Sequence, residues 1–556
     1  MINFLLVLSF AFCALSWLNP YHFGIWMAAE SEFLVFLALL LVFLYSIYKY
    51  KHLVVSKQNL PWVFIVIIPF IQYFFGKIYF FGDALIAFLY MISFFMALVL
   101  GNTLGQYKQE RQSFFLNFSY IVVFTGLISV YIQLNQWFYL DVSVVFMAEI
   151  PLDGRPFANF GQPNTLATFL CMGLMSSLYL YEKKYINRLI GILISILILF
   201  GIALTQSRTA WVFSFAFFIF WFWKTTNFQT RLKKWSVLYF AGIYLFFIII
   251  LPYISNYLGV IGTSDVLTRA TTGYLRIPMW NQMLHAIHHQ PWWGYGWNQV
   301  SVAQLAVVLD YPTTEWTEHS HNIILDLLIW NGIPLGFLII FFVAWWLYQL
   351  SKLATTIESF IALGMVGAVL VHAMLEYPLE YAFFLLPVGF LLGLVQAEDK
   401  KIKIIKIQRG FIGLFLTISI IIYTWIFVEY RMIEKDAQLV RFESLNIGTL
   451  HAEDAAPKVV LLTQLREKIR FIRTAPTKNM SEKQLDWMRS VAYRFASASA
   501  LHRYAQALAL NNQPELAKKH LRIIKQLHGK NYSFESLFYV NKSLAFEWNN
   551  QDMSKP

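Results

Sequence analysis

Two histidines and an acidic residue lie together in the segment TEHSHN, residues 317–322, directly before a long apolar run. A neutral imidazole near pH 7 can accept a proton from a hydroxyl group, so His319 and His321 are candidate general bases. Glu318 is close enough in sequence to orient or tune either ring. A structural alternative is that Ser320 or His321 caps the helix that the apolar run predicts. The segment alone leaves both interpretations open.

Three arginines stand beside apolar runs and are candidate groups for binding an anion. Arg155 lies in DGRPFAN, Arg208 in LTQSRTAW and Arg276 in GYLRIPMW. A guanidinium group stays charged and offers a phosphate two parallel hydrogen bonds. Each arginine can equally anchor a helix at the headgroup boundary of a membrane. Together they favour a substrate that is a phosphate-bearing lipid.

Amide and tyrosine side chains mark two further segments between apolar runs. In FANFGQPNTLATF, Pro163 suits the first position of a helix, Gln162 its N-cap, and Asn164 adds a second amide. The N–H groups at such a helix start attract anions. The turn LEYPLEYAF gathers two glutamates and two tyrosines, including Tyr377. An ordinary helix start and an interfacial tyrosine turn are the structural alternatives.

The sequence predicts neither a metal site nor a cofactor. HAIHH, residues 285–289, places three histidines on one side of a helix, but no cysteine or well-spaced carboxylate stands nearby. The two cysteines, Cys13 and Cys171, lie in separate apolar runs and give no disulfide framework.

The elements that must position these residues are apolar helices. Hydrophobic residues make up 58% of the chain and charged residues only 13%, too few to cover a soluble protein of this size. The apolar runs of the chain are long enough to cross a ~30 Å hydrocarbon core. The prediction is an all-α, polytopic membrane helix bundle of about thirteen spans. They are expected near 3–18, 32–48, 60–75, 83–102, 114–135, 163–181, 189–205, 209–223, 235–252, 322–350, 356–375, 380–397 and 410–428.

Loop charge predicts the orientation of these spans, because cytoplasmic loops are enriched in lysine and arginine. With the N-terminus inside, the inner loops hold most of the basic residues before residue 430. The outer loops hold only Lys77, Arg155, Arg208, Arg269 and Arg276. The net charge of +12 therefore mostly reflects the basic residues of the inner loops and does not indicate a nucleic-acid-binding surface. The long loop 253–321 and the C-terminal segment 430–556 are therefore both expected to face outward.

The predicted domains follow from this topology. They are membrane helices 1–9 at 1–252, an outward-facing loop at 253–321, membrane helices 10–13 at 322–429, and an outward-facing helical segment at 430–556. Residues 487–527 read as paired helices broken at NNQPE, with Pro514 in the first turn of the second. Small residues there allow close packing and resemble a tetratricopeptide-like repeat. A protein-binding surface and a plain helical cap are both open.

In combination, these motifs resemble the O-antigen ligase and polymerase superfamily, and within it the pilin-glycosylating protein O-oligosaccharyltransferase branch. TQSRTAW is similar to the T-x-S-R segment of the superfamily, and HHQPWWGYGWNQ to its Pro- and Gly-containing stretch. The H-[NSQ]-x9-G signature is met by His321, Asn322 and Gly332. FANFGQPNTLA resembles a patch of the protein-glycosylating branch. The match covers roughly residues 150–400.

The resemblance implies a metal-independent glycosyltransferase of a bacterial inner membrane, with its site, the loop 253–321 and the C-terminal segment in the periplasm. Its donor would be an undecaprenyl-pyrophosphate-linked oligosaccharide, and its acceptor a Ser or Thr hydroxyl of a periplasmic, pilin-like protein. It implies His321 as base, with His319 as the rival. Substrate-binding roles would fall to Arg208, Arg276, Gln162, Asn164, Tyr377 and Arg155.

Two other functions compete with this one. A lipid-A-core O-antigen ligase or a polysaccharide polymerase would run the same chemistry with a sugar as acceptor. A polysaccharide or lipid transporter would instead need polar residues along a path through several spans. The predicted spans are mostly apolar and the polar residues gather on one face, which favours surface chemistry over transport.

Overall fold

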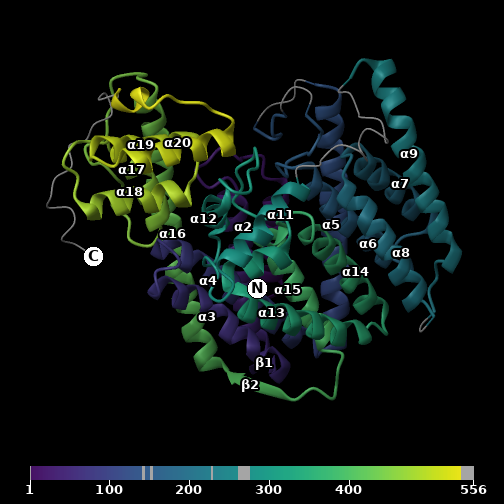
Figure 1. The fold of residues 1–556 in the computed structure, drawn as a ribbon. Coiled ribbons are helices and arrows are strands. Elements are labelled where there is room, and N and C mark those ends of the chain that lie inside the picture. The colour runs from purple at the N-terminus through teal and green to yellow at the C-terminus, as the bar shows by residue number, and fades with distance from the viewer. Residues whose placement is uncertain (1, 141–144, 151–153, 227–228, 261–275, 540–556) are drawn as a thin grey trace. The chain divides into compact units, whose positions relative to one another are not determined.

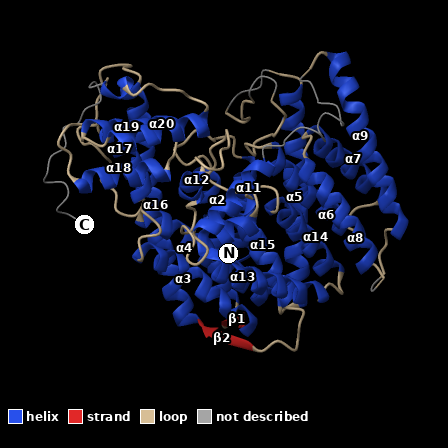
Figure 2. Ribbon diagram, viewed as in Figure 1, coloured by secondary structure: helices blue, strands red, loops and turns tan. Residues whose placement is uncertain are grey.

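The computed structural model is mostly helical, and the residues that it describes include one pair of short strands (Figure 2). It describes residues 2–140, 145–150, 154–226, 229–260 and 276–539. Arg269, one of the predicted outer arginines, lies outside the described residues. A helix occupies each of the thirteen predicted ranges. These helices are α1 Ile2–Leu18, α2 Ala29–Lys49, α3 Leu60–Phe74, α4 Phe81–Gly105, α5 Lys108–Trp137, α6 Pro163–Glu182, α7 Arg188–Leu204, α8 Arg208–Lys224, α9 Val237–Leu258, α13 Ile323–Lys352, α14 Ile357–Ala373, α15 Ala382–Gln396 and α16 Arg409–Ser444.

Six of the helical stretches are long and apolar enough to cross a membrane by length and composition. They are α2, α4, α5, α13, α16 and the stretch Lys234–Leu258 that contains α9. Shorter apolar helices include α1, α7, α14 and α15. The chain is therefore a helical membrane protein, and the count of thirteen crossings stays a prediction.

The chain divides into two compact units. Unit 1 comprises residues 1–64, 90–273 and 342–420, and unit 2 comprises residues 65–89, 274–341 and 421–556. The core of unit 1 is formed by large apolar side chains of the membrane helices, such as Trp17, Phe169 and Phe384, which are at most 1% exposed. Polar contacts also link distant parts of this unit. The buried carboxylate of Glu32 in α2 accepts the backbone N–H of Ala382, at 2.9 Å.

The strand pair belongs to unit 1 and was not predicted. β1, His52–Ser56, pairs antiparallel with β2, Ile404–Gln408, with His52 opposite Gln408. Both segments lie in loops that the charge pattern predicts to face the cytoplasm, residues 49–57 and 398–409. Their sequences, HLVVS and IIKIQ, contain the β-branched residues that favour strands. Neither segment is helical, so the backbone N–H and C=O groups of each strand find their hydrogen-bond partners in the other strand.

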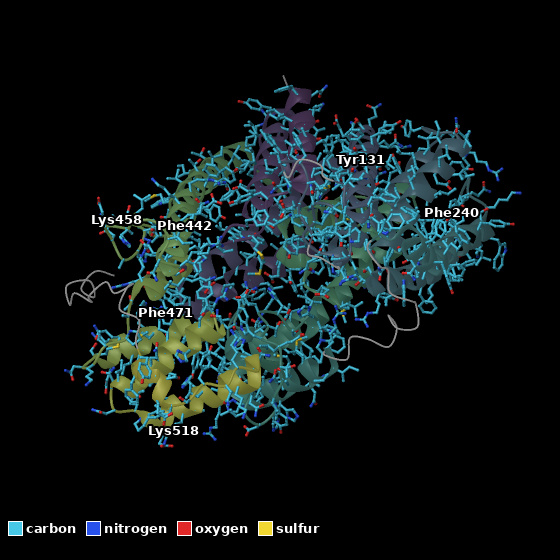
Figure 3. All side chains as sticks on the ribbon, turned by 90° about the horizontal axis from the view of Figure 1, so that it is seen from above. Tyr131, Phe240, Phe442, Lys458, Phe471 and Lys518 are labelled. Atoms are coloured by element: carbon cyan, nitrogen blue, oxygen red, sulfur yellow. The ribbon has the colours of Figure 1, made fainter. Side chains whose placement is uncertain are left out.

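Besides parts of α3, α4, α13 and α16, unit 2 contains the helices that lie within the predicted loop 253–321 and those of the C-terminal segment. These are α11 Arg276–His289, α12 Val300–Val307, α17 Thr463–Arg473, α18 Glu482–Arg494, α19 Ala498–Leu510 and α20 Pro514–His528 (Figure 1). Figure 3 marks Phe471 within the C-terminal group and Lys518 at its outer edge, in agreement with their burial and exposure.

The C-terminal segment has one helix boundary more than the sequence indicated. Pro514 is the first residue of α20, as predicted. The predicted first helix of the pair is divided, because Ser497 caps α19 by accepting the N–H of Ala500. Alanines such as Ala505 are fully buried between α19 and its neighbours, which lets the backbones approach closely. Arg473, fully buried, ties α17 to the end of α16 through ion pairs to Asp436 and Glu443 at 2.6 and 2.7 Å.

Candidate active site

Three of the predicted substrate-binding residues come together in unit 1, at the start of α6. Pro163 is the first residue of this helix and Gln162 takes the N-cap position, as predicted. The Gln162 amide donates to the Tyr377 hydroxyl at 2.9 Å, although 215 residues separate the two in sequence. Asn164 donates to the Glu376 carboxylate at 3.2 Å and accepts from Ser207 at 2.7 Å. The start of α6 thus joins the turn after α14 and the turn before α8.

Two buried amides hold the loop that leads into α6. The Gln136 side chain in α5 accepts the N–H groups of Phe157 and Ala158, at 3.0 and 2.7 Å, and donates to the carbonyls of Ala148 and Ala158. Asn159, only 3% exposed, donates to the carbonyls of Leu18 and Phe146. The motif FANFGQPN therefore acts as a rigid lead-in to the helix. In the sequence, Gln136 is only a polar residue at the end of an apolar run, and nothing there indicates its partners.

Arg155 and Arg208 meet the same turn of unit 1 in different ways. Arg155 donates to the backbone carbonyls of Thr205 and Gln206, at 3.2 and 3.4 Å. Gln206 adopts a positive φ of 51°, which makes the turn between α7 and α8 abrupt. Arg208 then begins α8. Arg155 therefore stabilises the turn that presents Arg208, in addition to any contact it makes with a substrate.

In unit 2, the segment 317–322 is fixed from several sides. Ser320 donates its N–H to the carboxylate of Asp326 at 2.8 Å, and its carbonyl accepts from the Trp280 indole at 2.9 Å. The N–H of Thr317 is bound by Gln304, which is fully buried, at 3.1 Å. The two histidines that follow are thus carried by a segment whose backbone is held in place by other elements.

His321 differs from His319 in its backbone. Its φ is +56°, in the left-handed region that non-glycine residues rarely occupy. Such conformations persist only where the surroundings enforce them, and they gather at functional sites. The helix cap is neither Ser320 nor His321: Asn322 caps α13, because its side chain accepts the N–H groups of Ile324 and Leu325 at 3.0 and 3.2 Å. His321 therefore does not cap α13, although the sequence allowed that role.

The glycine of the H-[NSQ]-x9-G signature breaks α13. Gly332 has φ 73° and ψ 174°, and a Cβ there would lie 2.5 Å from the Trp292 carbonyl oxygen. The segment PWWGYG binds the backbone groups around the break. Tyr295 and Gly296 donate to the carbonyls of residues 329 and 330 at 2.8 and 3.0 Å, and residue 333 donates to Pro291 at 2.6 Å. The segment PWWGYG and the residues around Gly332 belong to two separate sequence motifs, and backbone hydrogen bonds join them in the fold.

A glutamine that the sequence did not single out completes this junction. Gln72, near the end of α3, donates to the Trp330 carbonyl at 2.9 Å and accepts the N–H of Trp297 at 2.8 Å. Breaks in membrane helices require such partners, because no water is available to the freed backbone groups.

Arg276 is the first residue of α11 and belongs to the same unit as His321. It stands one helical turn before Trp280, the residue that binds the Ser320 carbonyl, so the two share a face of α11. Two histidines of HAIHH contact tyrosines: the ring of His285 stacks on Tyr311, and the Nδ1 atom of His289 forms a hydrogen bond with the Tyr295 hydroxyl at 3.3 Å. The predicted residues therefore form two groups, one in each unit.

Three known sequence families match the chain. The family described as "O-Antigen ligase" matches residues 193–340, which include Arg208, Arg276, His321 and Gly332. "Protein glycosylation ligase" matches residues 156–181, the lead-in to α6 and most of that helix. "Virulence factor membrane-bound polymerase, C-terminal" matches residues 360–538.

Two characterised relatives are similar over nearly the whole chain. A general O-oligosaccharyltransferase of Acinetobacter baylyi is 34% identical over 546 residues, which are 97% of this chain and 95% of the relative. A ComP-specific O-oligosaccharyltransferase of the same species is 28% identical over 508 residues, 90% and 91% of the two chains. The resemblance expected from the motifs is confirmed: the chain belongs to the O-oligosaccharyltransferase family and is a glycosyltransferase.

Proposed function

We propose that the protein transfers an oligosaccharide as one unit from undecaprenyl pyrophosphate to a Ser or Thr hydroxyl of a periplasmic protein, such as a pilin. Similarity to a general O-oligosaccharyltransferase over 97% of the chain supports the reaction class. The observation that carries the assignment of residues is the left-handed backbone of His321, fixed by the contacts of Ser320 to Asp326 and Trp280.

In this reaction the imidazole of His321 takes the proton of the acceptor hydroxyl. The hydroxyl oxygen forms a bond to the anomeric carbon, and the bond from that carbon to the pyrophosphate oxygen breaks. The pyrophosphate leaves with the electron pair and is already a stable anion, so it needs no general acid. Arg208 and Arg276 supply the positive charge that stabilises it. His319 is the alternative base.

The group at the start of α6 is assigned to positioning the donor. Gln162 is hydrogen-bonded to Tyr377, and Asn164 to Glu376 and Ser207. These hydrogen bonds orient both amide side chains. A helix start also favours an anion. Arg155 is assigned to the same substrate group, directly or through the turn that carries Arg208.

The proposed setting is a bacterial inner membrane crossed about thirteen times, with the site in the periplasm. The proposed domains are 1–252, 253–321, 322–429 and 430–556. In this arrangement the tetratricopeptide-like C-terminal segment engages the acceptor protein. Helices at all thirteen predicted ranges and the charge difference between the loops support this topology.

The test is expression of the chain in a bacterium that makes an undecaprenyl-linked glycan and a periplasmic pilin. The mass of the intact pilin is then measured. The native chain is expected to add the glycan mass, and His321→Ala to add none while reaching the same level in the membrane. His288→Ala, an exposed histidine of α11, is the matched control and should behave as the native chain. Full transfer by His321→Ala would remove this residue from the mechanism.

An O-antigen ligase is the second candidate, because the family with that description covers residues 193–340. It predicts restored O-antigen when the chain is expressed in a ligase-deficient strain. Restored O-antigen together with an unmodified pilin would replace the proposed acceptor by a lipid-linked sugar.

A further inference from the structure

A buried ion pair joins the C-terminal segment to the first turn of α4 within unit 2. Asp83, in that turn, is only 6% exposed. Arg494, the last residue of α18, meets both of its carboxylate oxygens at 3.0 Å. A buried carboxylate is costly without such a partner, and the two parallel hydrogen bonds fix the guanidinium plane.

The same guanidinium reaches the segment that carries the candidate bases. The Nη1 atom of Arg494 donates to Glu318 at 3.4 Å. The side chain of Glu318 is 44% exposed, whereas that of Arg494 is only 14% exposed. Asp83 therefore orients Arg494, and Arg494 in turn holds Glu318, which directly precedes His319 and stands three residues before His321.

The backbone of Arg494 supports this segment at a second point. Its carbonyl accepts from the hydroxyl of Ser301 in α12, at 3.4 Å, and Ser301 accepts the indole N–H of Trp316 at 3.3 Å. Trp316 and Glu318 flank Thr317, which Gln304 of α12 holds. The end of α18 is thus linked to both neighbours of Thr317.

We propose that Arg494 is a positioning residue for glycan transfer, and that it acts through Glu318 to fix the segment that carries His321. The C-terminal segment then takes part in the transfer step itself, in addition to any contact with the acceptor. This inference rests on the proposed function. Asp83 and Arg494 form the fixed part of the arrangement, and Glu318 is the exposed link to the site.

Glu318 is the residue to change, because an exposed ion pair contributes little to stability. Removal of Arg494 would instead leave Asp83 buried and unpaired, and the variant can fail to fold. Glu318→Ala is expected to lower kcat about tenfold and to leave the KM for the acceptor within about twofold, since a small displacement of a base slows the chemical step. Glu318→Gln keeps an oxygen that accepts from Arg494 and should recover most of the rate.

The matched control is Asp486→Ala. Asp486 lies on α18, is exposed, and forms an ion pair with Arg489 at 3.3 Å, and within the described part of the chain it has no hydrogen bond or ion pair with residues 316–321. Rates are measured with the full-length chain in membranes, a purified pilin and an undecaprenyl-pyrophosphate glycan, by intact mass over time. Asp486→Ala should match the native chain in both kcat and KM.

The possible outcomes separate this inference from the proposed function. If the native chain transfers no glycan to the pilin, the proposed function fails and this inference fails with it. If the native chain is active but Glu318→Ala keeps the native kcat, only the positioning role is overturned. A raised acceptor KM with an unchanged kcat would also overturn it, because Glu318 would then serve binding. A lowered kcat that Glu318→Gln does not recover would overturn the role of its contact with Arg494.

Discussion

Replacement of Gly332 by alanine is expected to disrupt the junction between α13 and the segment PWWGYG. The new Cβ would lie 2.5 Å from the Trp292 carbonyl oxygen and 2.8 Å from the Trp293 nitrogen, both backbone atoms. The backbone conformation, φ 73° and ψ 174°, is almost restricted to glycine and costs another residue about 1–3 kcal/mol. Moving the segment away would also weaken three backbone hydrogen bonds, each contributing about 1 kcal/mol.

The sum is about 4–6 kcal/mol, of which about 3 kcal/mol come from the contact and about 1–3 kcal/mol from the backbone conformation. Gly76→Ala separates the two contributions. Gly76 also has a positive φ, 69°, but no other group lies within 4 Å of its Cβ position. Its replacement should cost only about 1–2 kcal/mol.

The assay is thermal unfolding of the detergent-solubilised chain, followed by tryptophan fluorescence, together with glycan transfer. For a domain of 150–250 residues, about 2–4 °C of midpoint correspond to 1 kcal/mol. Gly332→Ala should therefore lower the midpoint by roughly 8–24 °C and Gly76→Ala by roughly 2–8 °C. Equal shifts for the two variants would refute the reasoning, because the close backbone approach would then have no energetic consequence.

Three further outcomes are expected. Gln136→Leu leaves the N–H groups of Phe157 and Ala158 without their acceptor, so the thermal midpoint should fall and transfer should weaken; native values for both would contradict this account. Arg276→Lys should lower transfer at least tenfold at an unchanged protein level, because a lysine cannot offer a phosphate the two parallel hydrogen bonds of a guanidinium; near-native transfer would argue against its role. Burial lowers the pKa of His502, His520 and His528 below their usual value near 6.5. The unfolded chain then binds more protons below about pH 6.5, so stability is expected to fall as the pH drops from there towards the folded-state pKa values. A midpoint in thermal scans that is no lower at pH 5.5 than at pH 7.5 would exclude this linkage.

The helices were predictable because apolar length is a strong local signal. Each run gave a helix, and Pro163 and Pro514 marked helix starts where they were expected. Helix caps were harder, since several polar residues compete for one position. Ser320 was a reasonable cap for α13, but its N–H binds Asp326, and Asn322 takes the cap.

Residues whose role depends on distant partners escaped prediction. Gln72, Gln136 and Gln304 are ordinary polar residues in the sequence, and only the fold shows that each binds the backbone of another segment. The link from Arg494 to Glu318 spans 176 residues and has no local pattern. The motif glycine was predictable as a position. The sequence could not show why a glycine is needed there, because the requirement comes from the Trp292 carbonyl group, which lies too close for a Cβ atom.

The pairing of β1 with β2 has a consequence for biogenesis. Synthesis proceeds at about 5–20 residues per second, so β2 leaves the ribosome roughly 20–70 s after β1. During that time β1 presents the unpaired backbone groups of an edge strand, which invite pairing with other chains. Glu32, 350 residues from Ala382, waits about as long for its backbone donor. A truncation before residue 404 should therefore leave a membrane-inserted chain that is recognised by quality-control proteases, whereas later truncations retain the strand pair.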